Sequence, residues 1–121
     1  MQILPQFFEL YRSIIATGTD ATLYFADKIP AGKVFVAEFV SVYIETADAG
    51  MDVLIVVGTP EKYRFISATE QATALRTVSI THKIIVSEYQ SLGVQLYEDE
   101  ANTVLHLYAQ GFIYDKSYMF V

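Results

Sequence analysis

The sequence predicts an all-β protein, a jelly-roll-like β-sandwich of about eight antiparallel strands. Short runs rich in Val, Ile, Phe, Tyr and Thr recur along the chain, and these side chains suit a pleated sheet. Turn residues separate the runs about every eight to twelve positions, which is typical of a sandwich. No helical pattern alternates regularly with the strands, so βαβ units are not expected.

The longest apolar run covers residues 33–46 and follows a turn that contains Pro30 and Gly32. If it alternates with period two, one face contains Val34, Val36, Glu38, Val40, Val42 and Ile44. The other face then contains Phe35, Ala37, Phe39, Ser41 and Tyr43. Because both faces are apolar, we expect cover on two sides: the sandwich core on one, and a loop, an arm or another protein on the other.

Further strands are expected at 21–25, 51–57, 63–66, 75–86, 92–97 and 103–114. Residues 81–83 predict a bulge or kink within the fourth of these, and residues 67–73 predict a surface loop or one helical turn. The loops 47–50 and 98–102 are each expected to close a hairpin between the strands that flank them.

The two ends are expected to act as arms on a single domain that spans residues 1–121. Residues 1–15 fit a helix that starts near Pro5, and they also fit a strand; the all-β remainder favours an extended segment. Residues 1–18 are therefore a candidate N-terminal arm. The apolar residues 116–121 follow a charged turn and are a candidate C-terminal arm.

The composition predicts association. Hydrophobic residues make up 53% of the chain and charged residues only 18%, where about 25% is usual. A solitary small sandwich needs a more polar outer layer, so we expect a homo-oligomer, with a trimer favoured. The net charge of −6 disfavours nucleic acid and anionic membranes as partners. No apolar run is long enough to span a bilayer, and no signal peptide is expected.

Candidate chemistry is sparse. The chain has no cysteine, so Cys-based zinc sites are excluded. His82 and His106 lie on different predicted strands and are expected to be surface or interface imidazoles. The acidic residues 98–100, with Asn102, could supply oxygens to calcium, but a solvated hairpin tip is favoured. Asp48 and Asp52 are interpreted in the same way.

Glu38 is a candidate buried acid on an apolar face. If it is buried, it needs a partner or a proton, and Lys33, Arg64 and Arg76 are candidate partners in a structural ion pair. No nucleophile-elbow or phosphate-binding glycine motif occurs, so neither an enzyme nor a cofactor is expected. Nine tyrosines and eight phenylalanines leave carbohydrate or receptor binding as the alternative function, although tryptophan is absent.

The residues expected to form an interface are the aromatic and apolar groups of the termini and the long strand. They are Phe7, Phe8, Tyr11, Phe35, Phe39, Tyr43, Tyr118, Met119, Phe120 and Val121.

Residues 24–45 carry a resemblance to a known family. A short strand leads to a Pro-Ala-Gly-Lys turn at Pro30–Lys33, and a long apolar strand follows at Val36–Val42. The stretch GFIYD at Gly111–Asp115 is also similar to a closing strand. This pattern resembles small β-sandwich structural proteins of tailed bacteriophages. The resemblance implies a jelly-roll-like virion subunit (a head decoration, head-fibre or tail-accessory protein, often trimeric) that binds a major capsid or tail protein and is assembled in the host cytoplasm. It carries over no functional residue.

Overall fold

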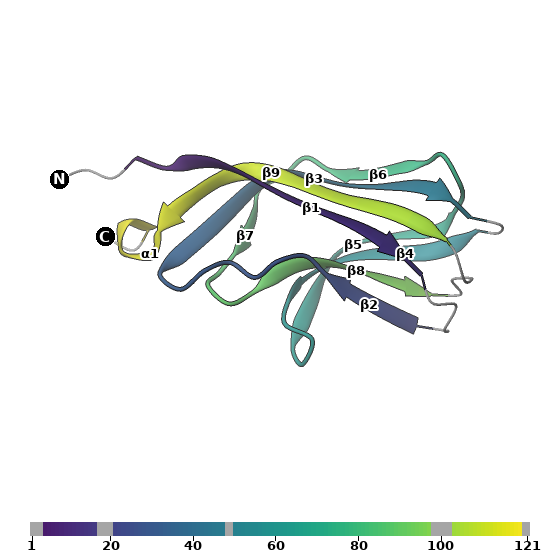
Figure 1. Ribbon diagram of the computed structural model, residues 1–121, viewed down its shortest axis with the longest axis horizontal. Helices are drawn as coiled ribbons and strands as arrows, with labels where there is room; N and C mark the ends of the chain where they lie inside the picture. The colour runs from purple at the N-terminus through teal and green to yellow at the C-terminus, as the bar shows by residue number, and fades with distance from the viewer. Residues whose placement is uncertain (1–3, 17–20, 48–49, 98–102, 120–121) are drawn as a thin grey trace.

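The computed structural model is a two-layered antiparallel β-sandwich (Figure 1). It describes residues 4–16, 21–47, 50–97 and 103–119. Sheet A has the order β1 (Gln6–Ile15), β9 (Val104–Asp115), β3 (Lys33–Thr46) and β6 (Thr77–Ile80), and β7 (Ile84–Val86) also pairs with β3. Sheet B has the order β2 (Ala21–Phe25), β8 (Ser91–Tyr97), β4 (Met51–Gly58) and β5 (Tyr63–Ala72).

The strand pairing is that of a jelly roll. The first half of the chain pairs with the second half in reverse order: β1 with β9, β2 with β8, β3 with β6 and β7, and β4 with β5. This nested hairpin is folded over, so that β9 also pairs with β3 and β8 also pairs with β4. The jelly-roll prediction is therefore confirmed.

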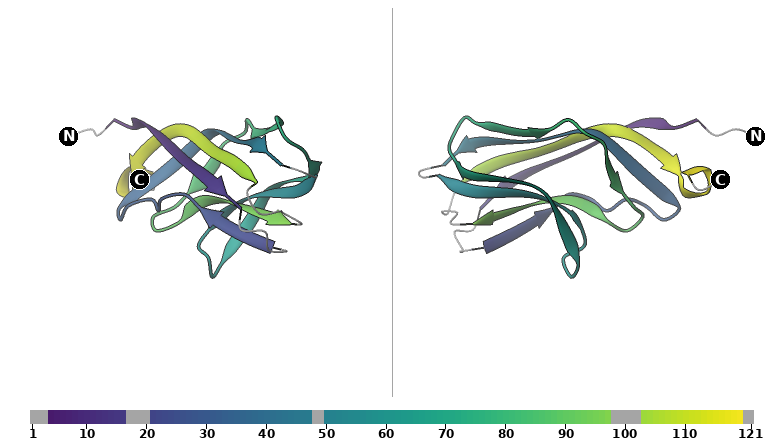
Figure 2. Two further views of the ribbon diagram at one scale, coloured as in Figure 1. Left: turned by 45° about the vertical axis from the view of Figure 1, so that its right-hand side comes forward. Right: turned by 180° about the vertical axis from the view of Figure 1, so that it is seen from behind.

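Two predicted hairpins are wrong. β3 and β4 lie in different sheets, and so do β8 and β9 (Figure 2). The loops between them therefore cross from one layer of the sandwich to the other. These crossings follow from the jelly-roll topology, because successive strand pairs of the nested hairpin belong alternately to sheet A and sheet B.

The core lies between the two sheets. Its largest fully buried side chains are Phe35, Ile14, Ile29, Ile44, Met51, Ile55, Leu92, Leu96, Leu105, Leu107, Val40 and Val42. All of them are aliphatic, aromatic or thioether groups, so the hydrophobic effect is the main force that holds the sheets together. Gln95 Oε1 is a buried side-chain oxygen without a hydrogen-bond partner in the described part of the chain.

The predicted N-terminal arm is instead an edge strand over most of its length. β1 pairs with β9 along all ten of its residues, and Leu10 and Ile14 point into the core. The structure thus decides between the helix and the strand that the sequence left open. Two buried apolar side chains and a complete antiparallel ladder outweigh the weak helical periodicity.

Other boundaries also differ from the predictions. β5 continues through residues 67–72, where a loop or helical turn was expected. The single strand expected at residues 75–86 is divided: the residues 81–83 that predicted a bulge or kink separate β6 from β7, and both strands pair with β3. The predicted C-terminal arm begins with the short helix α1 (Lys116–Met119), and residues 120–121 lie outside the described residues. In the described residues, no helix is long and apolar enough to cross a membrane.

A β-bulge in β3 corrects the predicted faces of the long strand. The register with β9 shifts between Ala37 and Phe39, so Glu38 is the extra residue. Core-facing side chains therefore change parity at this point, and those that point inward are Phe35, Ala37, Val40, Val42 and Ile44. Glu38 itself is exposed, so the predicted burial with an ion-pair partner is wrong.

Candidate interaction face on sheet A

The outer face of sheet A, which points away from the core, carries side chains from β1, β9 and β3. Residues that lie opposite each other in an antiparallel pair share a face, so the registers assign its members. The rows across the three strands are Phe7–Phe112–Val36, Glu9–Gln110–Phe39, Tyr11–Tyr108–Ser41, Ser13–His106–Tyr43 and Ile15–Val104–Thr46. Each of these rows contains at least one aromatic or aliphatic group, and we call the whole set the outer A face.

Several of the apolar groups on the outer A face are open to solvent. Phe7 is 56% exposed, Tyr11 63% and Ile15 65%. Tyr43 is 37% exposed, and Ile85, on the neighbouring β7, is 50% exposed. Several exposed apolar groups on one side of a sheet are typical of an interaction surface, whereas single exposed hydrophobic residues are not informative.

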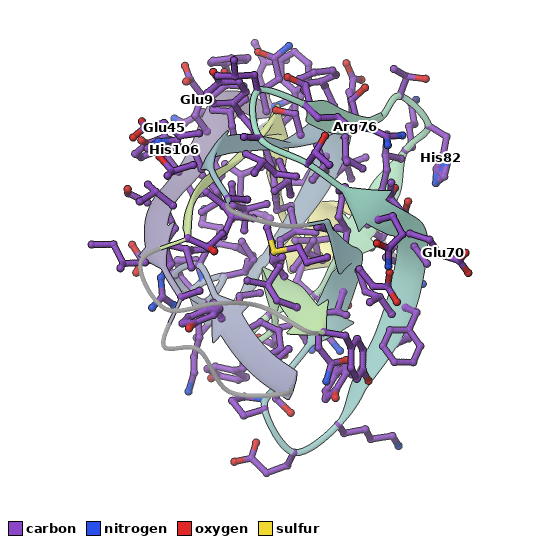
Figure 3. The ribbon with its side chains drawn as sticks, turned by 90° about the vertical axis from the view of Figure 1, so that its right-hand side faces the viewer. Glu9, Glu45, Glu70, Arg76, His82 and His106 are labelled. Atoms are coloured by element: carbon purple, nitrogen blue, oxygen red, sulfur yellow. The ribbon has the colours of Figure 1, made fainter. Side chains whose placement is uncertain are left out.

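His106 is at the centre of an ordered polar cluster on this face. Its Nδ1 lies 2.7 Å from the Tyr11 hydroxyl, and its Nε2 lies 2.9 Å from Glu45 Oε1. A second bulge in β3, between Ile44 and Thr46, makes Glu45 the extra residue and presents its carboxylate on the outer side. Figure 3 shows Glu45 and His106 close together at the margin of the molecule.

The rings around His106 form a row across three strands. The imidazole is nearly parallel to the ring of Tyr11, at a centroid distance of 5.9 Å, and to the ring of Tyr43, at 6.3 Å. A neutral imidazole donates from Nε2 to Glu45 and accepts at Nδ1 from Tyr11, whereas an imidazolium donates at both positions. The hydroxyl of Tyr11 serves as donor or acceptor, so the cluster is satisfied in both protonation states.

Tyr108 is fixed by its neighbours in the same way. Its hydroxyl lies 3.0 Å from Glu9 Oε2 and 3.0 Å from Gln110 Oε1. Loss of solvent around the phenol, together with the carboxylate of Glu9, raises the pKa of Tyr108 above its ordinary value of 10.0. The phenol is therefore neutral at physiological pH and acts as a hydrogen-bond donor.

The structure brings together four of the predicted interface residues and separates the others. Phe7, Tyr11, Phe39 and Tyr43 all lie on the outer A face. The prediction for Phe35 is wrong, because this residue is fully buried in the core.

The remaining predicted interface residues divide into two groups. Phe8 packs edge-on against Phe35, with ring centroids 5.2 Å apart, and is partly buried against the core. Tyr118 and Met119 belong to α1, and the predictions for their side chains stay untested. Phe120 and Val121 lie outside the described residues.

Prediction from sequence missed several members of the face, including Ile15, Tyr108 and Phe112. The signal was present, because residues 104–112 alternate strictly between large outward groups and small or aliphatic inward groups. What was missing was the knowledge that β9 lies between β1 and β3, which places its outward residues beside theirs.

The other candidate chemical groups do not converge on a site. His82 is exposed and lies on the opposite side of the molecule from His106 (Figure 3). Asp52 accepts a hydrogen bond from the backbone N–H of Gln71 at 3.1 Å. Asp48 and residues 98–102 lie outside the described residues. Among the residues that are described, no group of three or more potential ligands could hold a metal ion.

None of the three basic residues considered as partners for Glu38 is seen to pair with it in the described part of the chain. Lys33 forms an ion pair with Asp115 at 2.7 Å. The Arg64 guanidinium donates to the carbonyl of Ile85 at 3.2 Å. Arg76 is exposed, like Glu38 itself.

The outer face of sheet B also carries aromatic rings, of which Phe65 is 57% exposed. The ring of Phe25 packs onto Gly93, where an added Cβ would lie 2.6 Å from it. Phe25, Tyr63 and Phe65 contact one another edge-on, at centroid distances of 6.3 Å and 5.8 Å. Beside Tyr63 is an open hollow of about 340 Å³, lined by Val57, Thr59, Lys62, Tyr63, Arg64 and Gln90.

No protein-family model and no curated protein matches the chain. A structure of infectious bursal disease virus, Gx strain, is similar with a TM-score of 0.47 and 9% identity, over 91% of this chain and 31% of the viral chain. The Drosophila NLP-core, a structure described in terms of pentamer formation and histone binding, has a TM-score of 0.38 and 14% identity, over 86% of this chain and 95% of its own.

TmCBM61 in complex with beta-1,4-galactotriose is similar with a TM-score of 0.34 and 15% identity, over 90% of this chain and 63% of that chain. The chain thus spans about a third of the length of the viral chain that it resembles. All these TM-scores are below 0.5, so the similarities assign no function.

Proposed function

We propose that this chain is a non-enzymatic structural subunit of a virion that self-associates and attaches to a capsid or tail surface through the outer A face. The observation that carries the proposal is the exposure of apolar side chains from β1, β3 and β7 on the outer side of one sheet. The virion assignment rests on the resemblance of residues 24–45 to phage sandwich proteins. The trimer, the major capsid or tail protein as partner, and assembly in the host cytoplasm stay predictions.

The energetics favour cover on this face. Full burial of one large apolar side chain contributes about 1.5–3 kcal/mol. Phe7, Tyr11 and Ile15 each keep more than half of their surface exposed, so docking recovers about 1 kcal/mol or more from each of them. Several such contributions are needed to offset the entropy that two partners lose on association. The outer A face provides them, and a lone aromatic residue would not.

The order of the face also lowers the cost of docking. Tyr11 and Tyr43 are stacked on His106, and Tyr11 is also hydrogen-bonded to it, before any partner arrives. Immobilising a free side chain at an interface costs about 0.5–1.5 kcal/mol, and a fixed row of rings avoids part of this loss. The arrangement therefore suits a surface that binds a partner.

Attachment is tested on particles. Immunogold electron microscopy with antibodies to the purified chain is expected to show many gold particles on each virion from the source of the sequence. A Tyr43→Lys variant, which places a positive charge on the outer A face, is expected to be lost from particles. A Phe65→Lys variant is the matched control, because Phe65 is 57% exposed on the outer side of sheet B. A chain that is absent from particles and is a stable monomer at micromolar concentration contradicts the proposal.

Saccharide binding is the second candidate, and the hollow on sheet B is the observation that favours it. Tyr63 offers a ring, while Lys62, Arg64, Thr59 and Gln90 offer polar groups around it. Binding sites for small polar ligands combine such elements. A glycan-array signal that Tyr63→Ala abolishes and Tyr43→Lys leaves unchanged would favour this candidate over attachment through the outer A face.

A further inference from the structure

We propose that two copies of the chain pair through the open edge of β1, in an antiparallel contact that joins their A sheets into one. This inference rests on the self-association proposed above, and it specifies a pair of copies in place of the trimer predicted from the sequence. The occupant of the edge is the same strand of a second copy.

β1 is the last strand of sheet A. It pairs with β9 on one side, and no strand in the described part of the chain pairs with its other side (Figures 1 and 2). Natural edge strands are usually shortened, bulged or interrupted by proline or lysine, because an open edge is a template for pairing. β1 is ten residues long, its register with β9 has no shift, and it contains neither Pro nor Lys.

The charged groups of β1 leave its edge accessible. Arg12 points toward the other layer, where its guanidinium donates to the carbonyl of Phe25 and lies over the ring of Tyr24, 5.6 Å from the centroid. Arg12 is therefore held on the core side of β1. Glu9 accepts a hydrogen bond from Tyr108 on the outer A face.

The hydrogen-bond pattern identifies the groups at the open edge. The Ala16 N–H donates to the carbonyl of Thr103 at 2.8 Å, and these residues continue the register of β1 with β9. In an antiparallel ladder, residues alternate between those bonded to the partner and those that point away from it. The even-numbered residues of β1 therefore bond to β9. Those that direct N–H and C=O groups to the open edge are Phe7, Glu9, Tyr11, Ser13 and Ile15.

One register satisfies all of these groups. If Tyr11 lies opposite Tyr11 of the second copy, then Phe7 lies opposite Ile15, and Glu9 lies opposite Ser13. Each such pair exchanges two hydrogen bonds, so the five pairs form about ten. A shift by two residues in either direction leaves one end unmatched and separates Phe7 from Ile15. The preferred register also places no two like charges opposite each other.

The same register joins the two outer A faces. The five residues whose backbone groups point to the open edge are also the five that β1 contributes to the outer A face. Both sets are the odd-numbered residues of β1, because side-chain direction and hydrogen-bond direction alternate together along a strand. Phe7 and Ile15, which are 56% and 65% exposed, would then each gain an apolar neighbour. The pair of subunits thus presents one continuous aromatic surface of twice the width for attachment.

Single cysteines test the register, because the natural chain has none. Opposed residues in a hydrogen-bonded pair have Cα atoms about 5.5 Å apart, which is within disulfide range. Tyr11→Cys is therefore expected to form a disulfide-linked dimer under mild oxidation. Glu9→Cys alone is expected not to do so, because its copies lie four residues apart, roughly 13 Å along the strands. A mixture of Glu9→Cys and Ser13→Cys is expected to cross-link.

A proline variant tests the edge independently of any cysteine. Ser13→Pro removes an N–H that points to the open edge and leaves the ladder to β9 intact, a position where proline is tolerated. It is expected to convert the dimer into a monomer by light scattering, with an unchanged far-ultraviolet circular dichroism spectrum. Thr77→Lys, on the opposite edge of sheet A, is the control and is expected to stay dimeric.

The outcomes separate this inference from the proposed function. A wild-type dimer that Ser13→Pro dissociates, together with self-linking of Tyr11→Cys, supports the inference. A trimer, or association that Tyr43→Lys removes and Ser13→Pro leaves intact, overturns the β1 contact and leaves self-association standing. A wild-type chain that is monomeric at micromolar concentration overturns both.

Discussion

Gly111→Ala tests the steric reason for the bulge that orients the outer A face. Gly111 lies in β9 opposite Ala37, immediately before the bulge in β3. A Cβ at this position would lie 2.0 Å from the carbonyl oxygen of Val36 and 2.9 Å from Cα of Ala37. Both are backbone atoms of a central strand, so no side-chain rotation relieves the contact. Overpacking in a core costs about 1–3 kcal/mol, and we expect a loss of about 3 kcal/mol or more here.

Urea unfolding measures this loss. With a slope of about 1–3 kcal/mol/M, the midpoint is expected to fall by about 1–3 M. Gly32→Ala is the control, because its Cβ would meet no atom within 4 Å while its φ of +77° is unfavourable for alanine. That variant is expected to lose about 1–2 kcal/mol. If Gly111→Ala loses no more than Gly32→Ala, then close contact between β3 and β9 does not constrain the bulge.

Three further predictions concern stability. Phe35→Ala removes a fully buried ring and is expected to cost about 3–5 kcal/mol in chemical unfolding, whereas Phe7→Ala, at an exposed site, is expected to cost about 0.5 kcal/mol or less. Arg12→Met removes the hydrogen bond to the carbonyl of β2 and is expected to lower stability by about 1 kcal/mol; no change would mean that this link between the layers contributes nothing. The hydrogen bond from Lys116 lowers the pKa of Glu88 below its ordinary value of 4.5. The ionised Glu88 carboxylate therefore stabilises the fold above pH 4.5, and this contribution is lost as the pH falls through the lowered pKa. Unfolding free energies of Glu88→Gln are therefore expected to change less between pH 6 and pH 3 than those of the wild type, and an equal change would contradict this assignment.

Local residue patterns predicted most strands. The predicted strands 21–25 and 33–46 coincide with β2 and β3. β-branched and aromatic runs bounded by Gly, Pro and Asp identify strands because propensity and turn chemistry act within a few residues. An irregularity at residues 81–83 was predictable for the same reason, although the structure has an interruption there where a bulge or kink was expected. The loop expected at residues 67–73 was wrong, because β5 is held there by its pairing with β4, which overrides a polar composition.

The candidate site was only partly predictable. Phe7, Tyr11, Phe39 and Tyr43 were identified from their apolar character, and the structure places all four on the outer A face. Phe35 was misassigned because a strict period of two assumes a strand without a bulge. The extra residue at Glu38 depends on the close approach of β9 to β3, which no property of the run itself encodes.

By itself, the sequence determined that this chain is an all-β sandwich with more apolar side chains than a polar outer layer allows. The tertiary structure decided which of those side chains face the core and which face outward. It also placed β9 between β1 and β3, so that Tyr11, His106 and Tyr43 form one row. The physical reason is that strand propensity is local, whereas the direction of a side chain depends on register, and register is set by partners far away in the chain.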